Sequence, residues 1–309
     1  WVASNGTAEL VAYAGDGTRL GEVAVPEGAS GAGAAPTGLV FNTTSDFVIG
    51  SGRRSGPATL ITASEDGTIS AWNPDVNATQ AVLVVDNSED GSVYKGVTIA
   101  QMHGSSFVYA ANFHNGTVDV FDADFNPVTL SSSAFQDRRI PANYAPFNVQ
   151  NVGNRIFVTY AQQDDMKHDD VPGPGHGFVD VFTSNGKLIS RFAARGSLNS
   201  PWAVLPVRPR LSGTNTTVLI GNFGDGFISA FTGRLNTVQG TLFQGTKTTI
   251  EPVATIGGQS LQIDGLWGMA IRNASDQPVR PSIVFASGPN DEQNALVGFL
   301  VPTRMGFLR

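Results

Sequence analysis

The chain repeats a pattern in which two segments of alternating apolar and polar residues flank a short turn. One copy spans residues 60–72 around Asp66-Gly67, and another spans residues 107–121 around Asn115-Gly116. A period of two places successive side chains on opposite faces of a strand, and Asn-Gly or Asp-Gly supplies the positive φ angles that tight turns need. The pattern therefore predicts β-hairpins.

Six hairpins of this kind are predicted, at residues 1–13, 60–72, 107–121, 156–182, 218–231 and 283–299. From the second onwards, an apolar inner strand precedes each hairpin, at residues 36–41, 94–99, 145–149, 200–204 and 265–271. Candidate outer strands follow at residues 20–25, 81–85 and 187–192. Repeats of about 40–70 residues with about four strands each are typical of a β-propeller. We therefore predict an all-β, six-bladed propeller that forms a single domain over residues 1–309.

The first predicted blade is incomplete, because Trp1 already belongs to its second strand. Three alternatives would complete it. Residues upstream of Trp1 supply the strand, the segment Arg304 to Arg309 fills the gap, or the open edge accepts a strand from a neighbouring chain, since unpaired edge groups invite pairing.

Composition narrows the classes of function. A net charge of −7 argues against nucleic-acid binding, which needs clustered Lys and Arg. The chain has no cysteine, which excludes disulfides and thiolate metal sites. No apolar run is long enough to predict a membrane span.

Asn-x-Ser/Thr sequons occur at six positions, where roughly three would arise by chance. This mild excess and the low charge favour a secreted glycoprotein, and hence an extracellular location. The alternative for Asn5 and Asn115 is that the turn itself requires Asn-Gly. The six sequons begin at Asn5, Asn42, Asn77, Asn115, Asn215 and Asn273.

Polar residues close the second strand of each predicted hairpin: Ser4, Ser64, Asn112, Gln162, Asn222 and the pair Asn290-Asp291. Propellers place these positions on one face around a central funnel. Amide and carboxylate oxygens suit Ca²⁺ or a polyhydroxylated ligand. The candidate metal ligands are therefore Asn112, Gln162, Asn222, Asp264 and Asp291. The alternative is that these side chains only satisfy backbone groups in the turns.

One hairpin has a long loop, residues 162–177, where the other hairpins turn in a few residues. Long loops in compact repeats are often functional. A metal site and a solvated acidic loop are the two alternatives, and the second is favoured because Asp164 and His168 lack the helix that their spacing would need. The charged residues of this loop are Asp164, Asp165, Lys167, His168, Asp169, Asp170 and His176.

Several motifs together resemble a family of uncharacterised secreted β-propeller proteins. They lie at residues 167–182, 198–202, 221–226, 263–268 and 288–292, and the resemblance covers nearly the whole chain. It implies a six-bladed, NHL-like propeller with an inner strand before the first residue of this chain. Some bacterial members carry a C-terminal sorting signal, and none is expected at Arg309. The resemblance implies no catalytic residues.

Three functions follow as hypotheses. The preferred one is an extracellular glycoprotein that binds carbohydrate or protein, or serves as a structural module. The second is a metal-dependent, lactonase-like hydrolase or lyase that uses a divalent cation, most simply Ca²⁺, in the polar funnel. The third is a subunit of an extracellular assembly that is completed by strand donation.

Overall fold

The computed structural model describes residues 1–207, 215–236, 241–242, 250–252, 259–272, 282–290 and 292–301. These residues form β-strands and two short 3-10 helices, Asn5–Thr7 and Ser88–Asp90, and all strands of the described sheets pair antiparallel. None of these helices has the length or the apolar character needed to cross a membrane. The contacts divide the chain into unit 1 (residues 1–171 and 177–194) and unit 2 (172–176 and 195–309).

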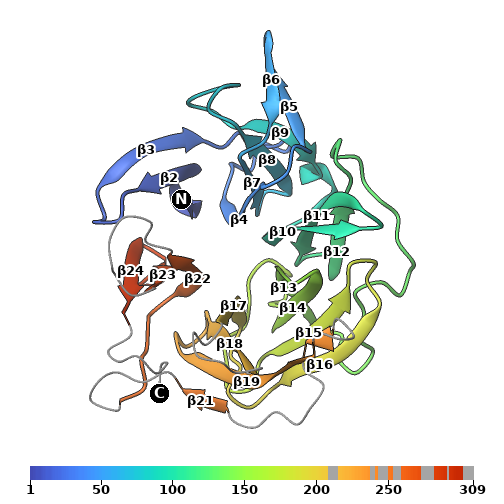
Figure 1. The fold of residues 1–309 in the computed structure, drawn as a ribbon, viewed down its shortest axis with the longest axis vertical. Helices are drawn as coiled ribbons and strands as arrows, with labels where there is room; N and C mark the ends of the chain where they lie inside the picture. Colours follow the sequence, from blue (N-terminus) through green and yellow to red (C-terminus); the bar gives the residue numbers. More distant parts are fainter. Residues whose placement is uncertain are drawn as a thin grey trace. The chain divides into compact units, whose positions relative to one another are not determined.

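Unit 1 begins with a three-stranded and a four-stranded sheet (Figure 1). The first sheet consists of β1 (Val2–Ser4), β2 (Glu9–Tyr13) and β3 (Arg19–Ala24). The second consists of β4 (Pro36–Phe41), β7 (Leu60–Ser64), β8 (Thr68–Trp72) and β9 (Val82–Asp86). Among the described strands, β1 pairs with β2 alone, so the first sheet has no inner strand of the kind that β4 gives to the second.

Two further sheets complete unit 1, one of three strands and one of four. The third sheet contains β10 (Tyr94–Met102), β11 (Ser105–Asn112) and β12 (Thr117–Phe121). The fourth contains β13 (Tyr144–Val152), β14 (Arg155–Gln162), β15 (Phe178–Thr183) and β16 (Leu188–Ala194). A separate hairpin of β5 (Val48–Ser51) and β6 (Arg54–Pro57) projects beyond the second sheet (Figure 1).

Unit 2 contains the remaining two sheets, one of five strands and one of three. The fifth sheet consists of β17 (Pro201–Val207), β18 (Asn215–Asn222), β19 (Ile228–Asn236), β20 (Thr241–Leu242) and β21 (Ile250–Pro252). The sixth consists of β22 (Leu266–Arg272), β23 (Ser282–Ser287) and β24 (Leu296–Leu300). The segment Arg304 to Arg309 lies outside the described residues.

The predicted hairpins and inner strands are confirmed, because each predicted pair of strands is hydrogen-bonded in the expected order. The five inner strands are β4, β10, β13, β17 and β22. Two sheets have the predicted four strands and the others have three or five. The β5–β6 hairpin was not predicted, since Ile49 is its only buried residue and Gly, Ser and Arg make up most of the rest.

The hydrophobic core of unit 1 lies between neighbouring sheets, and the alternation of the strands accounts for it. Along β11, Val108 and Ala110 enter one buried cluster, whereas Tyr109 and Ala111 enter the next. Both faces of this strand are therefore buried, which explains its nearly continuous apolar sequence. Each large side chain that is fully buried in this way contributes about 1.5–3 kcal/mol to stability.

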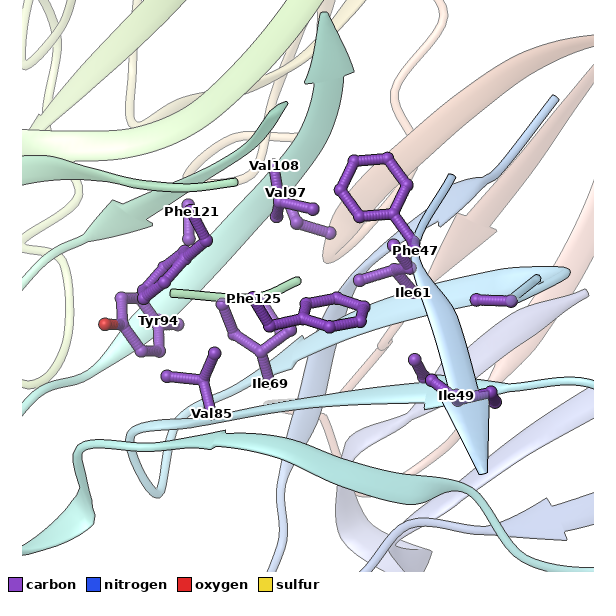
Figure 2. Packing of buried hydrophobic residues seen from close by; sticks show 14 of the residues in the cluster. Phe47, Ile49, Ile61, Ile69, Val85, Tyr94, Val97, Val108, Phe121 and Phe125 are labelled. Carbon is purple, nitrogen blue, oxygen red and sulfur yellow. The ribbon is translucent and has the colours of Figure 1, made fainter. Parts of the chain in front are cut away.

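The cluster between the second and third sheets also contains residues from outside the main strands (Figure 2). Phe47 precedes β5 and Phe125 follows β12, and their ring centroids are 5.5 Å apart. Figure 2 shows these rings close to Ile61 and Ile69. The loops of the two sheets are thereby anchored in the same core.

Adjacent inner strands of unit 1 approach each other closely. A Cβ atom on Gly96 of β10 would lie 2.0 Å from Oδ1 of Asn148 on β13, so only glycine fits at this position. The inner strands β10 and β13 are therefore crowded at this contact.

Candidate functional site

In five sheets, the second strand ends opposite the first residue of the inner strand, and we call this the loop end of the sheet. The polar residues predicted there occupy it: Ser64 pairs with Pro36, Asn112 with Tyr94, Gln162 with Tyr144 and Asn222 with Pro201. The sixth position was predicted wrongly. Ser287 closes β23 opposite Leu266, while Asn290 lies in the turn that follows, and Asp291 lies outside the described residues.

Four of the five inner strands carry a β-bulge directly after their first residue, whereas the register shift of β13 lies further along, between Pro146 and Asn148. In three inner strands, two residues lie within the register shift, and the second of them is glycine. These pairs are Thr37-Gly38, Lys95-Gly96 and Trp267-Gly268. A bulge releases a residue from the strand ladder and changes the direction of its side chain. The second residue of the inner strand is therefore placed to face the loops, and it differs in chemistry from sheet to sheet.

At this position in the third sheet, Lys95 is buried among groups from three other sheets, and its side chain is 2% exposed. Its ammonium group forms ion pairs with Glu65 and with Asp169, the latter at 3.3 Å. Nδ2 of Asn5 donates to the other oxygen of Glu65 at 3.0 Å, and Nδ1 of His168 lies 3.0 Å from Asp169. We call these five residues the Lys95 cluster.

The Lys95 cluster brings together loops that are distant in the sequence. Asn5 lies between β1 and β2, Glu65 between β7 and β8, and Asp169 between β14 and β15, so each belongs to a loop that joins a second strand to a third. These contacts place the loops of the first, second and fourth sheets beside the start of the inner strand β10.

The electrostatics of the cluster keep the lysine charged. Burial lowers the pKa of the Lys95 ammonium, but the carboxylates of Glu65 and Asp169 outweigh burial and raise the pKa above its ordinary value. Partial burial raises the pKa of Asp169, yet Lys95 and His168 bring it below its ordinary value. The arrangement is a fixed positive charge between two carboxylates.

The long loop after β14 holds Asp169 in place. The backbone N–H of Asp164 donates to the carbonyl of Asp169 at 2.9 Å, and its carboxylate accepts from the N–H of His168 at 2.8 Å. Lys167 adopts a left-handed conformation in the turn, and Asp170 pairs with Gln163. Asp165 and Lys167 are exposed. His176 belongs to unit 2, where its N–H donates to the carbonyl of Gly173.

The candidate metal ligands occupy different environments. In unit 1, the Asn112 amide donates to Ser92 and Asp119 and accepts from two backbone N–H groups, whereas Gln162 is half-buried at the end of β14. In unit 2, Asn222 donates to Ser197 and Asp225, and its Oδ1 is buried with no described partner. Asp264 is exposed and accepts from the N–H of Asn290 at 3.0 Å.

Within the part of the chain that is described, no three His, Asp or Glu side chains are placed to hold a metal ion together.

The described sequons differ in accessibility. Nδ2 of Asn42 donates to two backbone carbonyls at 2.9 Å, and that of Asn5 donates to Glu65. Asn115 is exposed, while Asn77 is half-buried and accepts backbone N–H groups through Oδ1. Asn215 is the first residue of β18, and Asn273 lies outside the described residues.

Sequence reasoning did not identify Lys95 or Glu65 as site residues. Glu65 lies next to Asp66-Gly67 and resembles an ordinary turn residue, and its contact with Lys95 joins positions 30 residues apart. The available signal was a lysine followed by glycine within an otherwise apolar inner strand, because a lysine there must find a partner when it is buried.

The fold of the chain is all-β and propeller-like. Regucalcin from Agrobacterium tumefaciens, a calcium-binding protein of known structure, superimposes with a TM-score of 0.52 at 11% identity, covering 85% of this chain and 73% of regucalcin. BBS1N, solved in complex with ARL6DN, gives a TM-score of 0.46 at 11% identity over 97% of this chain and 74% of BBS1N.

Sequence relatives come from Acanthamoeba polyphaga mimivirus. The uncharacterised protein L690 is 32% identical over 309 residues, which cover 97% of this chain and 76% of L690. R648 is 30% identical over 87% of the chain and 65% of R648, and R640 is 31% identical over 75% of the chain and 43% of R640. The chain belongs to the family of L690, and it spans less than two thirds of R648 and R640. No model of a known protein family matches it.

Proposed function

We propose that the chain is an extracellular, non-catalytic binding module, built as one six-bladed, NHL-like β-propeller domain over residues 1–309. Its ligand contacts the loop ends of the sheets. The observation that carries this proposal is the Lys95 cluster, in which loops of the first, second and fourth sheets converge on an inner strand of the third.

The state of Lys95 supports binding over covalent catalysis. A nucleophilic or Schiff-base lysine needs a lowered pKa, so that a neutral amine is available. Here the pKa of Lys95 is raised, and both carboxylates hold its protons. The cluster therefore orders the loops and presents acceptor oxygens, since Asp169 is 67% exposed.

Six sheets of three or more strands among the described residues support the six-bladed count, and hydrophobic clusters between neighbouring sheets support blade-like packing. An exposed sequon at Asn115 supports the extracellular location. Mass spectrometry of native protein that found Asn115 and Asn77 without glycan would count against that location.

The absence of cysteine allows a direct test of the loop end, because a single introduced cysteine is the only thiol. Asp165→Cys places it in the exposed loop after β14, and Ser105→Cys places it at the opposite end of the third sheet. Each variant is coupled to a bulky polyethylene-glycol maleimide. Binding is then measured on a printed oligosaccharide array and on a panel of immobilised extracellular-matrix proteins.

We expect at least one probe to bind, and the polymer on Asp165→Cys to block it while that on Ser105→Cys does not. Blocking from the Ser105 position alone, or no binding to either panel, would contradict the proposed function.

Calcium binding is a second candidate, favoured by the buried Oδ1 of Asn222 that lacks a hydrogen-bond partner. Regucalcin is a calcium-binding protein, and an amide oxygen beside the carboxylate of Asp225 is suitable for Ca²⁺. Asn112 fits less well, because both ends of its amide are already bonded. The lactonase-like hydrolase would need such an ion and stays a prediction, as does strand donation at β1.

Thermal unfolding in millimolar CaCl₂ and in chelator tests this candidate. Free ion at a hundred times its Kd stabilises a protein by about 2.7 kcal/mol. We expect Asn222→Ala to remove any such gain and Asn112→Ala to keep it, which makes the second variant a matched control. A gain that depends on neither asparagine would place the ion elsewhere.

A further inference from the structure

The loop end of unit 2 presents aromatic side chains where the third sheet has a lysine. Trp267 follows the first residue of β22 at the same kind of bulge as Lys95. Its ring centroid lies 4.2 Å from that of Phe223, with 32° between the planes, and Trp202 packs against it at 5.6 Å and 90°. All three are half-buried.

Carboxylates lie next to this aromatic group. Nε1 of Trp267 donates to Oε1 of Glu292 at 2.5 Å, which fixes the indole plane, and Glu292 is exposed. Asp264, two residues before β22, is also exposed and accepts from the N–H of Asn290. We call Trp267, Phe223, Glu292 and Asp264 the Trp267 surface.

Backbone contacts hold the loops of this surface together. The N–H of Ile263 donates to the carbonyl of Gly226, and that of Gly288 donates to the carbonyl of Gly265, each at 2.9 Å. Gly265 has φ +60°, and a Cβ there would lie 2.2 Å from the Gly288 carbonyl oxygen, so this approach needs glycine. The surface is therefore formed before any ligand arrives, which lowers the entropy cost of binding.

We infer that the Trp267 surface binds a carbohydrate, and this rests on the proposed binding function. An aromatic ring can pack against the C–H face of a sugar ring, and the N–H of the indole allows polar groups to lie at the edge of the tryptophan ring. Carboxylates only accept hydrogen bonds, so Glu292 and Asp264 pair with a ligand rich in hydroxyl donors. The buried hydroxyls of Ser200 and Ser287, which have no described partner, add hydrogen-bonding capacity beside Phe223 and Trp267.

A cationic ligand is the competing chemistry, because aromatic rings and carboxylates also attract ammonium groups. Recognition of quaternary ammonium ligands uses several rings that form a cage around the charge. Phe223 and Trp267 instead stack on each other, with 4.2 Å between their centroids and 32° between their planes, so only an outer face of the pair can form a platform and no cage lies between the rings. A neutral sugar therefore fits this geometry better.

The test uses the full chain and neutral oligosaccharides of hexoses and N-acetylhexosamines. The array identifies the tightest tetrasaccharide, and calorimetry then measures its Kd. We expect Trp267→Ala to weaken binding at least tenfold and Glu292→Gln several-fold, while Glu27→Gln, an exposed carboxylate in unit 1, leaves the Kd unchanged. Sugar should also change the tryptophan fluorescence of the wild type and of Trp72→Phe, but not that of Trp267→Phe.

The Trp267→Phe and Glu292→Gln variants keep the test informative if Trp267→Ala does not fold. An unchanged Kd in every Trp267 variant would overturn the inference. So would binding only to amine-bearing oligosaccharides. If no oligosaccharide binds but a matrix protein does, and the polymer on Asp165→Cys blocks that protein, only the carbohydrate site is refuted. If nothing binds on either panel, the proposed function is refuted as well.

Discussion

Unit 1 contains two clusters in which one cation lies between two carboxylates, and they differ in their access to solvent. Arg191 pairs with Asp180 and, at 2.7 Å, with Asp137, and these two carboxylates are 0% and 3% exposed. Lys95 pairs with Glu65 and Asp169, which are 14% and 67% exposed. Arg139 also pairs with Asp137 from the surface. We call the first group, with Arg139, the Arg191 cluster.

This difference in solvent access indicates a structural role for the Arg191 cluster and a binding role for the Lys95 cluster. Asp180 and Arg191 are cross-strand partners on β15 and β16, and Asp137 fastens the segment between β12 and β13 to them. Neither Arg191 nor Asp180 can exchange its partner without leaving a buried charge unpaired. Asp169 can leave Lys95 at small cost, because its carboxylate is already largely hydrated. The Lys95 cluster, which is accessible to solvent, therefore suits ligand recognition, and the buried Arg191 cluster suits stability. We call them the open cluster and the closed cluster.

The largest expected effect comes from removing the cation of the closed cluster. Arg191→Met leaves Asp180 buried without its partner and Asp137 paired with Arg139 alone, and breaking a buried pair costs about 3–5 kcal/mol. Urea unfolding at neutral pH measures the loss. Arg139→Met is the matched control, because its side chain is 65% exposed and such pairs contribute up to about 1 kcal/mol. Equal losses in the two variants would show that the cluster is not closed.

The same cluster has a pH signature. Burial raises the pKa of Asp180 to about 6, despite Arg191, whereas hydrogen bonds from Arg139 and Arg191 lower that of Asp137. An unfolded Asp titrates near pH 4, so between about pH 4 and 6 the folded chain holds the extra proton at Asp180. Its contribution to stability is complete below pH 4 and is lost as the pH rises through 6, by about 2–3 kcal/mol.

Asp137 acts in the opposite direction: its contribution is present above pH 4 and is lost as the pH falls through its lowered pKa. Urea unfolding from pH 4 to 7.5 compares the wild type with Asp180→Asn. The difference between their pH profiles should change between about pH 4 and 6 and level off above pH 6, since only the wild type titrates at Asp180. Parallel profiles would rule out the raised pKa.

Strand periodicity and turn residues were enough to predict the hairpins, the inner strands and the loop end. Each depends on local sequence, as at Asp66-Gly67 and Asn115-Gly116, and alternation over a few residues determines which faces are buried. The β5–β6 hairpin escaped prediction because Ile49 is its only buried residue, so no apolar alternation marks its strands.

The site residues depend on contacts that local patterns do not contain. The Lys95–Asp169 pair joins positions 74 residues apart, and only the packing of the sheets brings them together. Prediction instead chose Asn112 for its position at a strand end, and its amide proves to be bonded to its own turn and to Ser92. The inner-strand bulge at Lys95-Gly96 was the informative feature, because it changes the direction of one side chain.

Removing the cation of the open cluster should cost less than removing that of the closed one. Lys95→Met leaves two carboxylates that can both reach water, so we expect a loss of about 1–3 kcal/mol in the free energy of unfolding. Urea unfolding beside Arg191→Met makes the comparison direct. A loss as large as that of Arg191→Met would mean that Asp169 and Glu65 are not free to hydrate.

Asp169→Asn is expected to have the smallest effect on stability, but a clear effect on the pKa of Lys95. An exposed partner contributes up to about 1 kcal/mol, so unfolding should hardly change. The pKa of Lys95 should fall relative to the wild type, because one of the two carboxylates that raise it is gone. The chain has four lysines, so NMR of the labelled Cε positions can follow Lys95 directly.

Asp165→Asn is the control for this last variant, since Asp165 lies in the same loop and is exposed. It should leave the pKa of Lys95 unchanged. If Asp169→Asn also leaves it unchanged, Glu65 alone holds the ammonium group, and Lys95 is then enclosed as completely as Arg191. The structural distinction between the two clusters, and with it the case for a ligand site at Lys95, would no longer hold.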